Sequence, residues 1–218
     1  MNRRMACSAL ALAAVFLGAV VAYTAWPRHA DLRAFEPPEI ARLETAMWRD
    51  YYEKRHLALF GHLYQLSRSQ FGFAPLDSFR IALAAAQAAS TFQPTRSREA
   101  ANTALPSLET YYRLLASAVP GGFDVAKAAR VELDWWQARR EAVGPDQYGV
   151  TVARVSAIVY GKPAEDPSLL TAGIGRADAM AYRDEIGEAM TDPDWSEVEC
   201  RLRRAYWSLK AAVAGGEP

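Results

Sequence analysis

Residues 40–66, IARLETAMWRDYYEKRHLALFGHLYQL, form the stretch that decides the fold. At about 100° per residue its apolar side chains share one broad face, a pattern typical of an α-helix packed on a core. That face consists of Ile40, Leu43, Met47, Trp48, Tyr51, Ala58, Leu59 and Leu66. Three polar side chains, Glu44, Arg55 and His62, fall on the same face. We therefore predict a helix over residues 38–70 that turns charged groups toward the interior.

Helix signals continue to the end of the chain. Caps, prolines and glycines mark further helices over residues 77–92, 97–120, 124–144, 146–160, 166–190 and 192–215. Pro106 interrupts the helix over residues 97–120. No segment shows the alternating pattern of a convincing strand. The sequence predicts an all-α fold, with an antiparallel bundle of about seven helices over residues 38–215.

The N-terminus carries a long uncharged run. Residues 5–26 contain no charged side chain and follow Arg3 and Arg4. As a helix this run would span roughly 33 Å, enough to cross a hydrocarbon core. Its length and the aromatic Tyr23 and Trp26 favour a transmembrane signal anchor over residues 1–26, with a cleaved signal peptide as the alternative. The two arginines place the following domain on the outer side of the membrane.

The composition and net charge of the chain limit which partners it can bind and indicate its source. The chain has 25 basic and 25 acidic residues, so it offers no basic field for nucleic acid, and we exclude that class of partner. Only four of the basic residues are lysine, a bias that indicates a GC-rich bacterial genome. Residues 27–37 are polar and bounded by proline, which predicts a short tether. Together with the anchor, this predicts a single-pass protein of a bacterial inner membrane with its domain on the periplasmic side.

Charged residues on inner helix faces indicate a candidate cleft. In the fourth predicted helix, Glu132 and Arg139 fall on the apolar side. Because a buried charge is tolerated only when it is paired, we expect the first and fourth predicted helices to pack antiparallel. In that contact Glu44 would lie near Arg139 or Arg140, and Glu132 near Arg55. The candidate ligand-binding residues are Glu44, Tyr51, Arg55, Glu132 and Arg139.

These charges admit two interpretations. They can be structural ion pairs, or rim residues whose aliphatic stems cover the edge of the apolar face. They can also be carboxylates that line a cleft and bind a ligand or exchange protons with it. A closed, fully paired network without a cavity would favour the structural interpretation. An open cavity with an unpaired carboxylate would favour the cleft.

Signatures of metal or nucleophilic chemistry are weak. Glu53 and His56 match the Glu-x-x-His element of carboxylate-bridged metal sites, but such sites need two of these elements facing inward. Here there is one, and it lies on the polar face. No Cys/His cluster has zinc spacing, and no serine or cysteine stands beside a recognisable base. We expect no metal and no other cofactor, and we assign no catalytic residue.

Two functional hypotheses follow. The first is a membrane-tethered, extracytoplasmic interaction or accessory protein without catalysis of its own, which would contact a protein partner or a second copy of itself. The anchor and the missing catalytic signatures favour this hypothesis. The alternative is an enzyme or small-ligand-binding bundle that uses a Glu/Arg/Tyr-lined cleft between the first and fourth predicted helices.

Overall fold

The computed structural model describes residues 3–25 and 29–214, and every regular element in these residues is helical, which confirms the predicted all-α class. The α-helices are α1 (Arg3–Ala25), α2 (Pro37–Tyr52), α3 (His56–Gln65), α4 (Pro75–Phe92), α5 (Arg98–Ala101), α6 (Leu105–Ala116), α7 (Val125–Arg140), α8 (Pro145–Tyr160), α9 (Pro167–Ile186) and α10 (Asp192–Ala214). Three short helical turns, η1 (Leu66–Gln70), η2 (Asn102–Ala104) and η3 (Gly187–Ala189), adjoin α3, α6 and α9.

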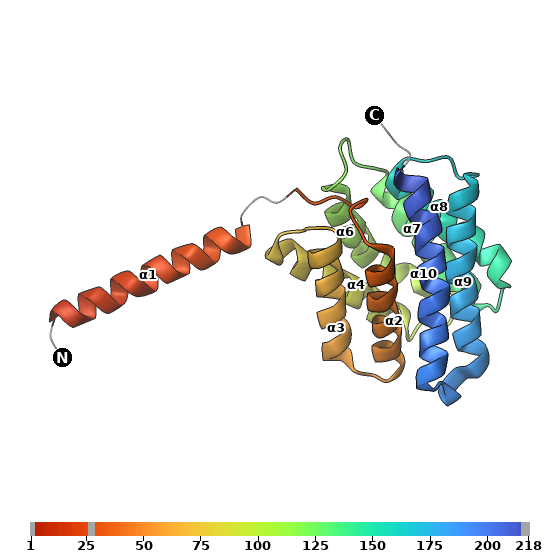
Figure 1. Ribbon diagram of the computed structural model, residues 1–218, viewed down its shortest axis with the longest axis horizontal. Coiled ribbons are helices and arrows are strands. Elements are labelled where there is room, and N and C mark those ends of the chain that lie inside the picture. Colours follow the sequence, from red (N-terminus) through yellow and green to blue (C-terminus); the bar gives the residue numbers. More distant parts are fainter. Residues whose placement is uncertain (1–2, 26–28, 215–218) are drawn as a thin grey trace.

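The helices after α1 close into a ring of neighbours. From α2 the packed pairs run to α10, α9, α8, α7, α6, α4 and α3, and α3 packs back on α2. Figure 1 shows the blue helices α9 and α10 side by side, with α2 next to α10. Inward-facing side chains from helices that are far apart in the sequence therefore meet in one interior. Because α2 and α7 are not neighbours in this ring, the predicted antiparallel packing of the first and fourth helices is wrong. Side chains of the two helices still meet where Arg139 of α7 donates to the Tyr52 hydroxyl of α2.

The helix predicted over residues 38–70 is broken in two. Residues 53–55 form a turn between α2 and α3 in which Lys54 has a φ of 59°, a left-handed conformation that ends an α-helix. The backbone N–H of Arg55 donates to the carbonyl oxygen of Asp50 at 2.8 Å. The segment predicted over residues 97–120, with an interruption at Pro106, is divided just before that proline into α5, η2 and α6. These breaks give the bundle more helices than the seven expected.

The segment predicted as a tether packs on the bundle. Leu32 and Phe35 are 3% and 0% exposed, and Phe35 belongs to a core cluster with Ile40, Leu169 and Val213. Lys210 on α10 donates to the carbonyl oxygen of Phe35 at 2.9 Å. Residues 27 and 28 of the predicted tether lie outside the described residues. The described part of this segment thus contributes to the core.

Helices α8 and α9 approach unusually closely, because glycine faces glycine at their crossing. A Cβ built on Gly173 would lie 2.4 Å from the carbonyl oxygen of Gly149 and 2.6 Å from the backbone nitrogen of Ala153. A Cβ on Gly149 would lie 2.6 Å from the Cα of Ile174. Only glycine fits both positions, and the close contact fixes how α9 presents its other side chains to the interior.

Helix α1 projects from the bundle in Figure 1, and it contacts α4. Its described apolar side chains, among them Leu12, Phe16 and Tyr23, are exposed. Within residues 3–25 and 29–214, no helix combines the length and apolarity that a membrane crossing requires. The predicted transmembrane helix is therefore unsupported. Residues 1, 2 and 26 of that predicted span lie outside the described residues.

Candidate functional site: an interior cavity

The side chain of Glu44 on α2 is a buried carboxylate that faces the interior of the helix ring. Glu44 is 2% exposed and accepts a hydrogen bond from Arg176 Nε of α9 at 2.8 Å. The Nη2 group of Arg176 donates to the same oxygen, and the hydroxyl of Tyr206 on α10 donates to the other. Three helices thus supply one closed cluster, in which the buried negative charge is both paired and hydrogen-bonded.

Burial and neighbouring charges together shift the pKa values of Arg176 and Tyr206 in this cluster. The pKa of Arg176 is raised because the attraction of Glu44 outweighs the cost of burying the guanidinium. Glu132 also contributes to that shift, so its negative charge reaches Arg176. Burial, followed by the charge of Glu44, raises the pKa of Tyr206 well above its ordinary value. Tyr206 therefore stays a neutral hydrogen-bond donor to Glu44 at neutral pH.

A second carboxylate, Glu132 on α7, has a different environment. One of its oxygens accepts from the hydroxyl of Tyr112 on α6 at 2.9 Å, and the other accepts from the Trp136 indole N–H at 3.0 Å. Glu132 forms no ion pair within 4 Å among the described residues. Burial, then the charge of Glu132, raises the pKa of Tyr112 well above its ordinary value. Glu132 is thus a half-buried carboxylate held only by neutral donors.

Three cavities meet at these charged groups. The largest has a volume of about 520 Å³ and extends between α2, α3, α4 and α7, with Glu132 and Arg176 in its lining. Smaller cavities of about 210 Å³ and 170 Å³ are lined by Arg176, Tyr111, Tyr112 and Tyr206. Arg176 lines all three, so they are adjoining parts of the ring interior. The cavity of about 520 Å³ is in the size range of sites that hold small organic molecules in other proteins.

The largest cavity is mostly apolar and rich in aromatic groups. Its aromatic lining consists of Trp48, Tyr51, Phe60, Trp135 and Trp136, with His56. Trp135 and Trp136 lie edge to face, with ring centroids 6.1 Å apart. The indole N–H of Trp135 is buried, and it has no hydrogen-bond partner among the described residues. Alanines of α4 (Ala85, Ala86 and Ala89) form another part of the wall. Small side chains there leave the space that larger ones would fill.

A fourth, smaller cavity of about 160 Å³ adjoins the aromatic wall. Arg139 of α7 lies in its lining, together with Tyr52. Arg139 donates to Asp184 from Nε at 2.9 Å and from Nη2 at 2.8 Å, and also to the Tyr52 hydroxyl at 2.5 Å. Arg139 therefore links α7 to α9 and α2.

The structure places four of the five predicted site residues in the linings of adjoining cavities and leaves Arg55 outside them. Tyr51 and Glu132 line the largest cavity, and Glu44 lines the 210 Å³ cavity. Arg139 lines only the smaller aromatic cavity among those described above, and Arg55 lines none of them. The prediction that Glu44 faces the interior is confirmed by its burial.

The predicted charge pairs are wrong, because the ring places different helices opposite one another. Glu44 pairs with Arg176, and Glu132 is held by Tyr112 and Trp136. Arg140, the other expected partner of Glu44, donates instead to backbone carbonyls of Phe92 and Thr95. Arg55, the expected partner of Glu132, binds Asp50 at 2.7 Å.

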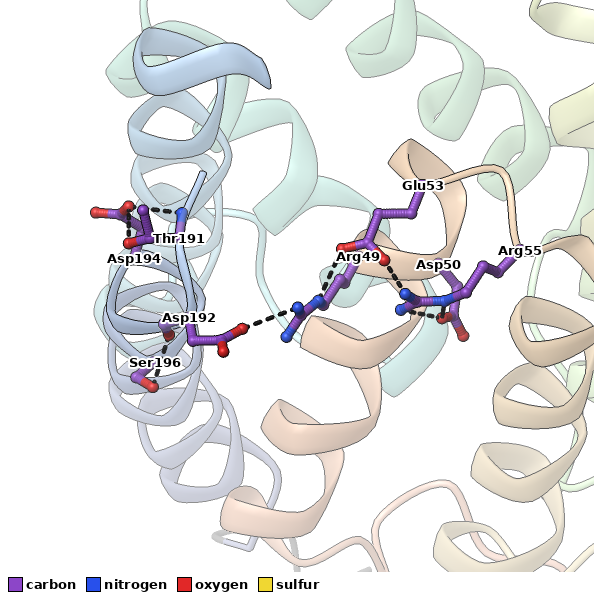
Figure 2. A network of polar contacts seen from close by, with 8 residues as sticks. All are labelled: Arg49, Asp50, Glu53, Arg55, Thr191, Asp192, Asp194 and Ser196. Carbon is purple, nitrogen blue, oxygen red and sulfur yellow. Dashed lines mark hydrogen bonds and ion pairs between the residues drawn. The ribbon is translucent and has the colours of Figure 1, made fainter. Parts of the chain in front are cut away.

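Asp50 forms a clasp between α2 and α3. Its side chain is 3% exposed and accepts from Arg55 at 2.7 and 2.8 Å and from His62 Nδ1 at 2.7 Å. Figure 2 shows Arg55 and Glu53 turned back toward α2, with Arg49 reaching Asp192 at the start of α10. Helix α3 contains no fully buried residue. The clasp therefore positions a lightly packed helix that forms one wall of the largest cavity.

Sequence reasoning missed Arg176, the side chain common to the three cavities. It follows Gly173 by three residues and precedes Met180 by four, both buried on the inner face of α9. This position on an apolar helix face was the signal that the sequence offered, because an arginine there requires a buried partner. No family model, curated protein or solved structure matches this chain.

Proposed function

We propose that this all-α domain binds a small organic molecule in the 520 Å³ cavity between α2, α3, α4 and α7. The observation that supports the proposal is an aromatic-walled space reaching a carboxylate, Glu132, that has no ion pair among the described residues. A purely structural network would pair every charge and leave no cavity. The Glu44–Arg176 cluster fits that structural role, whereas Glu132 does not.

A neutral fluorescent probe, N-phenyl-1-naphthylamine, tests this proposal on the full chain. We expect it to bind at one site per chain with increased fluorescence, because it is apolar and of a size that suits the cavity. Ala86→Phe places a large ring in the cavity wall and should weaken binding at least about tenfold. Ala126→Phe is the matched control, since Ala126 is exposed on α7. Equal probe binding by wild type and Ala86→Phe would contradict the proposal.

Localisation at the periplasmic side of an inner membrane stays a proposal from the sequence. It is supported by the uncharged run over residues 5–26 and the preceding Arg3 and Arg4. Reporter enzymes fused after residue 30 test it directly. An active periplasmic reporter would support the proposal, and an active cytoplasmic reporter would contradict it.

A further inference from the structure

We infer that the ligand of the largest cavity carries a positively charged nitrogen beside an apolar body, with Glu132 as its counter-ion. This inference rests on the proposed function and adds the chemical class of the ligand. It is drawn from three observations: the balance of charges, the free hydrogen-bonding capacity of Glu132, and the aromatic walls around it.

Among the described residues that line the ring interior, the carboxylates outnumber the guanidinium groups by one. The carboxyl and guanidinium side chains lining the three adjoining cavities are Glu44, Glu132 and Arg176, two carboxylates against one guanidinium, and the imidazole of His56 also lines the largest cavity. Arg176 donates twice to Glu44, which also receives the hydroxyl of Tyr206. That cluster is neutral and closed. A cation bound beside the remaining carboxylate, Glu132, would neutralise its negative charge.

Glu132 also has room for another donor. Each of its oxygens accepts one hydrogen bond from a neutral group, Tyr112 at 2.9 Å and Trp136 at 3.0 Å. An ionised carboxylate offers about four acceptor positions, so about two stay free. The side chain is half-buried and lines both the 520 Å³ and the 170 Å³ cavity. A charged N–H donor in the cavity would form a charge-assisted bond, which is roughly twice as strong as a neutral one.

The walls near Glu132 suit a cation as well. Trp48, Tyr51, Trp135 and Trp136 line the same cavity, and aromatic faces attract ammonium and guanidinium groups. The guanidinium of Arg176 already lies 5.4 Å from the ring centroid of Trp135. An anionic ligand would meet the uncompensated charge of Glu132 in the same space, while Arg176 is neutralised by Glu44. The arrangement therefore selects a cation over an anion of the same shape.

Three probes with one naphthalene body test the charge preference by isothermal titration calorimetry on the full chain at pH 7. They are 1-naphthylmethylamine, which is cationic, 1-naphthylmethanol, which is neutral, and 1-naphthoate, which is anionic. We expect the amine to bind at least about tenfold more tightly than the alcohol, and the naphthoate to bind most weakly. An alcohol or naphthoate that binds as tightly as the amine would overturn the inference and leave the proposed function standing.

Substitution of Glu132 tests whether this carboxylate causes the preference for the cationic probe. Glu132→Gln should reduce the amine affinity about tenfold or more while changing the alcohol affinity less than about threefold. Asp134→Asn is the matched control, because Asp134 lies on the same helix but is not among the residues lining the cavity. An unchanged preference for the amine in a folded Glu132→Gln variant would overturn the assignment of the counter-ion. Failure of all three probes and of N-phenyl-1-naphthylamine to bind would overturn the proposed function itself.

Discussion

Replacing Glu44 with glutamine would leave the buried guanidinium of Arg176 without its ion-pair partner. Glu44 is 2% exposed, and both an Arg176 nitrogen at 2.8 Å and the Tyr206 hydroxyl donate to it. Breaking a buried pair from one side costs about 3–5 kcal/mol, because the remaining charge is uncompensated. The amide oxygen of glutamine can still accept one bond, and Glu132 still attracts Arg176. We therefore expect a loss near the lower limit, about 3 kcal/mol.

Urea unfolding followed by circular dichroism at pH 7 measures this loss. A change of about 3 kcal/mol corresponds to a Tm lower by roughly 6–12 °C in a chain of this size. Glu39→Gln is the matched control on α2, since Glu39 forms an exposed pair with Arg42 at 2.6 Å whose loss should cost at most about 1 kcal/mol. Replacing the pair together, as Glu44→Leu with Arg176→Met, should recover much of the loss. A Glu44→Gln variant within about 1 kcal/mol of the wild type would refute the reasoning.

Three further predictions concern other parts of the molecule. Burial raises the pKa of Tyr111, Tyr112, Tyr160 and Tyr206 above the ordinary value of 10, so the unfolded chain loses these protons first and stability should fall as pH rises above 10. Urea midpoints across that range check the slope, and a constant midpoint would contradict it. Gly173→Ala should destabilise by about 1–3 kcal/mol because its Cβ would meet α8, whereas Gly61→Ala, in open space on α3, should be neutral or stabilising by up to about 1 kcal/mol. Thermal melts compare the two variants, and an equally stable Gly173→Ala would show that the helices are not held this close. Asp50→Asn should weaken the clasp to Arg55 and His62 and raise hydrogen exchange in α3 about tenfold or more, without affecting α9. Unchanged exchange in α3 would mean that the clasp does not hold this helix.

Local signals account for the parts of the fold that the sequence could predict. The caps are examples: Asp124 accepts from the backbone N–H of Lys127 at 2.9 Å, and Ser97 accepts from that of Ala100 at 3.1 Å. The turn that separates α2 from α3 had no such signal. Its left-handed residue is Lys54, where glycine or asparagine would have been expected. The break is stabilised instead by the contacts of Asp50 with Arg55 and His62, which helical periodicity does not reveal.

The candidate site could be predicted only in part, for the same reason. The helical register of Glu44 and Glu132 indicated correctly that each faces inward, because that property depends on one helix alone. Their partners depend on which helices are neighbours and how each is rotated. The ring order places α10 next to α2 and α9 next to α10, and Glu44 therefore binds Arg176 and Tyr206 instead of Arg139 or Arg140.

The most direct test of the ligand cavity is a two-dimensional NMR spectrum of the tryptophan indole groups, recorded while 1-naphthylmethylamine is added. Trp48, Trp135 and Trp136 line the cavity, whereas Trp195 and Trp207 lie elsewhere on α10. The account predicts that the indole signals of the first three shift together and saturate, while those of Trp195 and Trp207 stay in place. Shifts confined to Trp195 or Trp207, or no saturable shift at Trp48, Trp135 or Trp136, would contradict it.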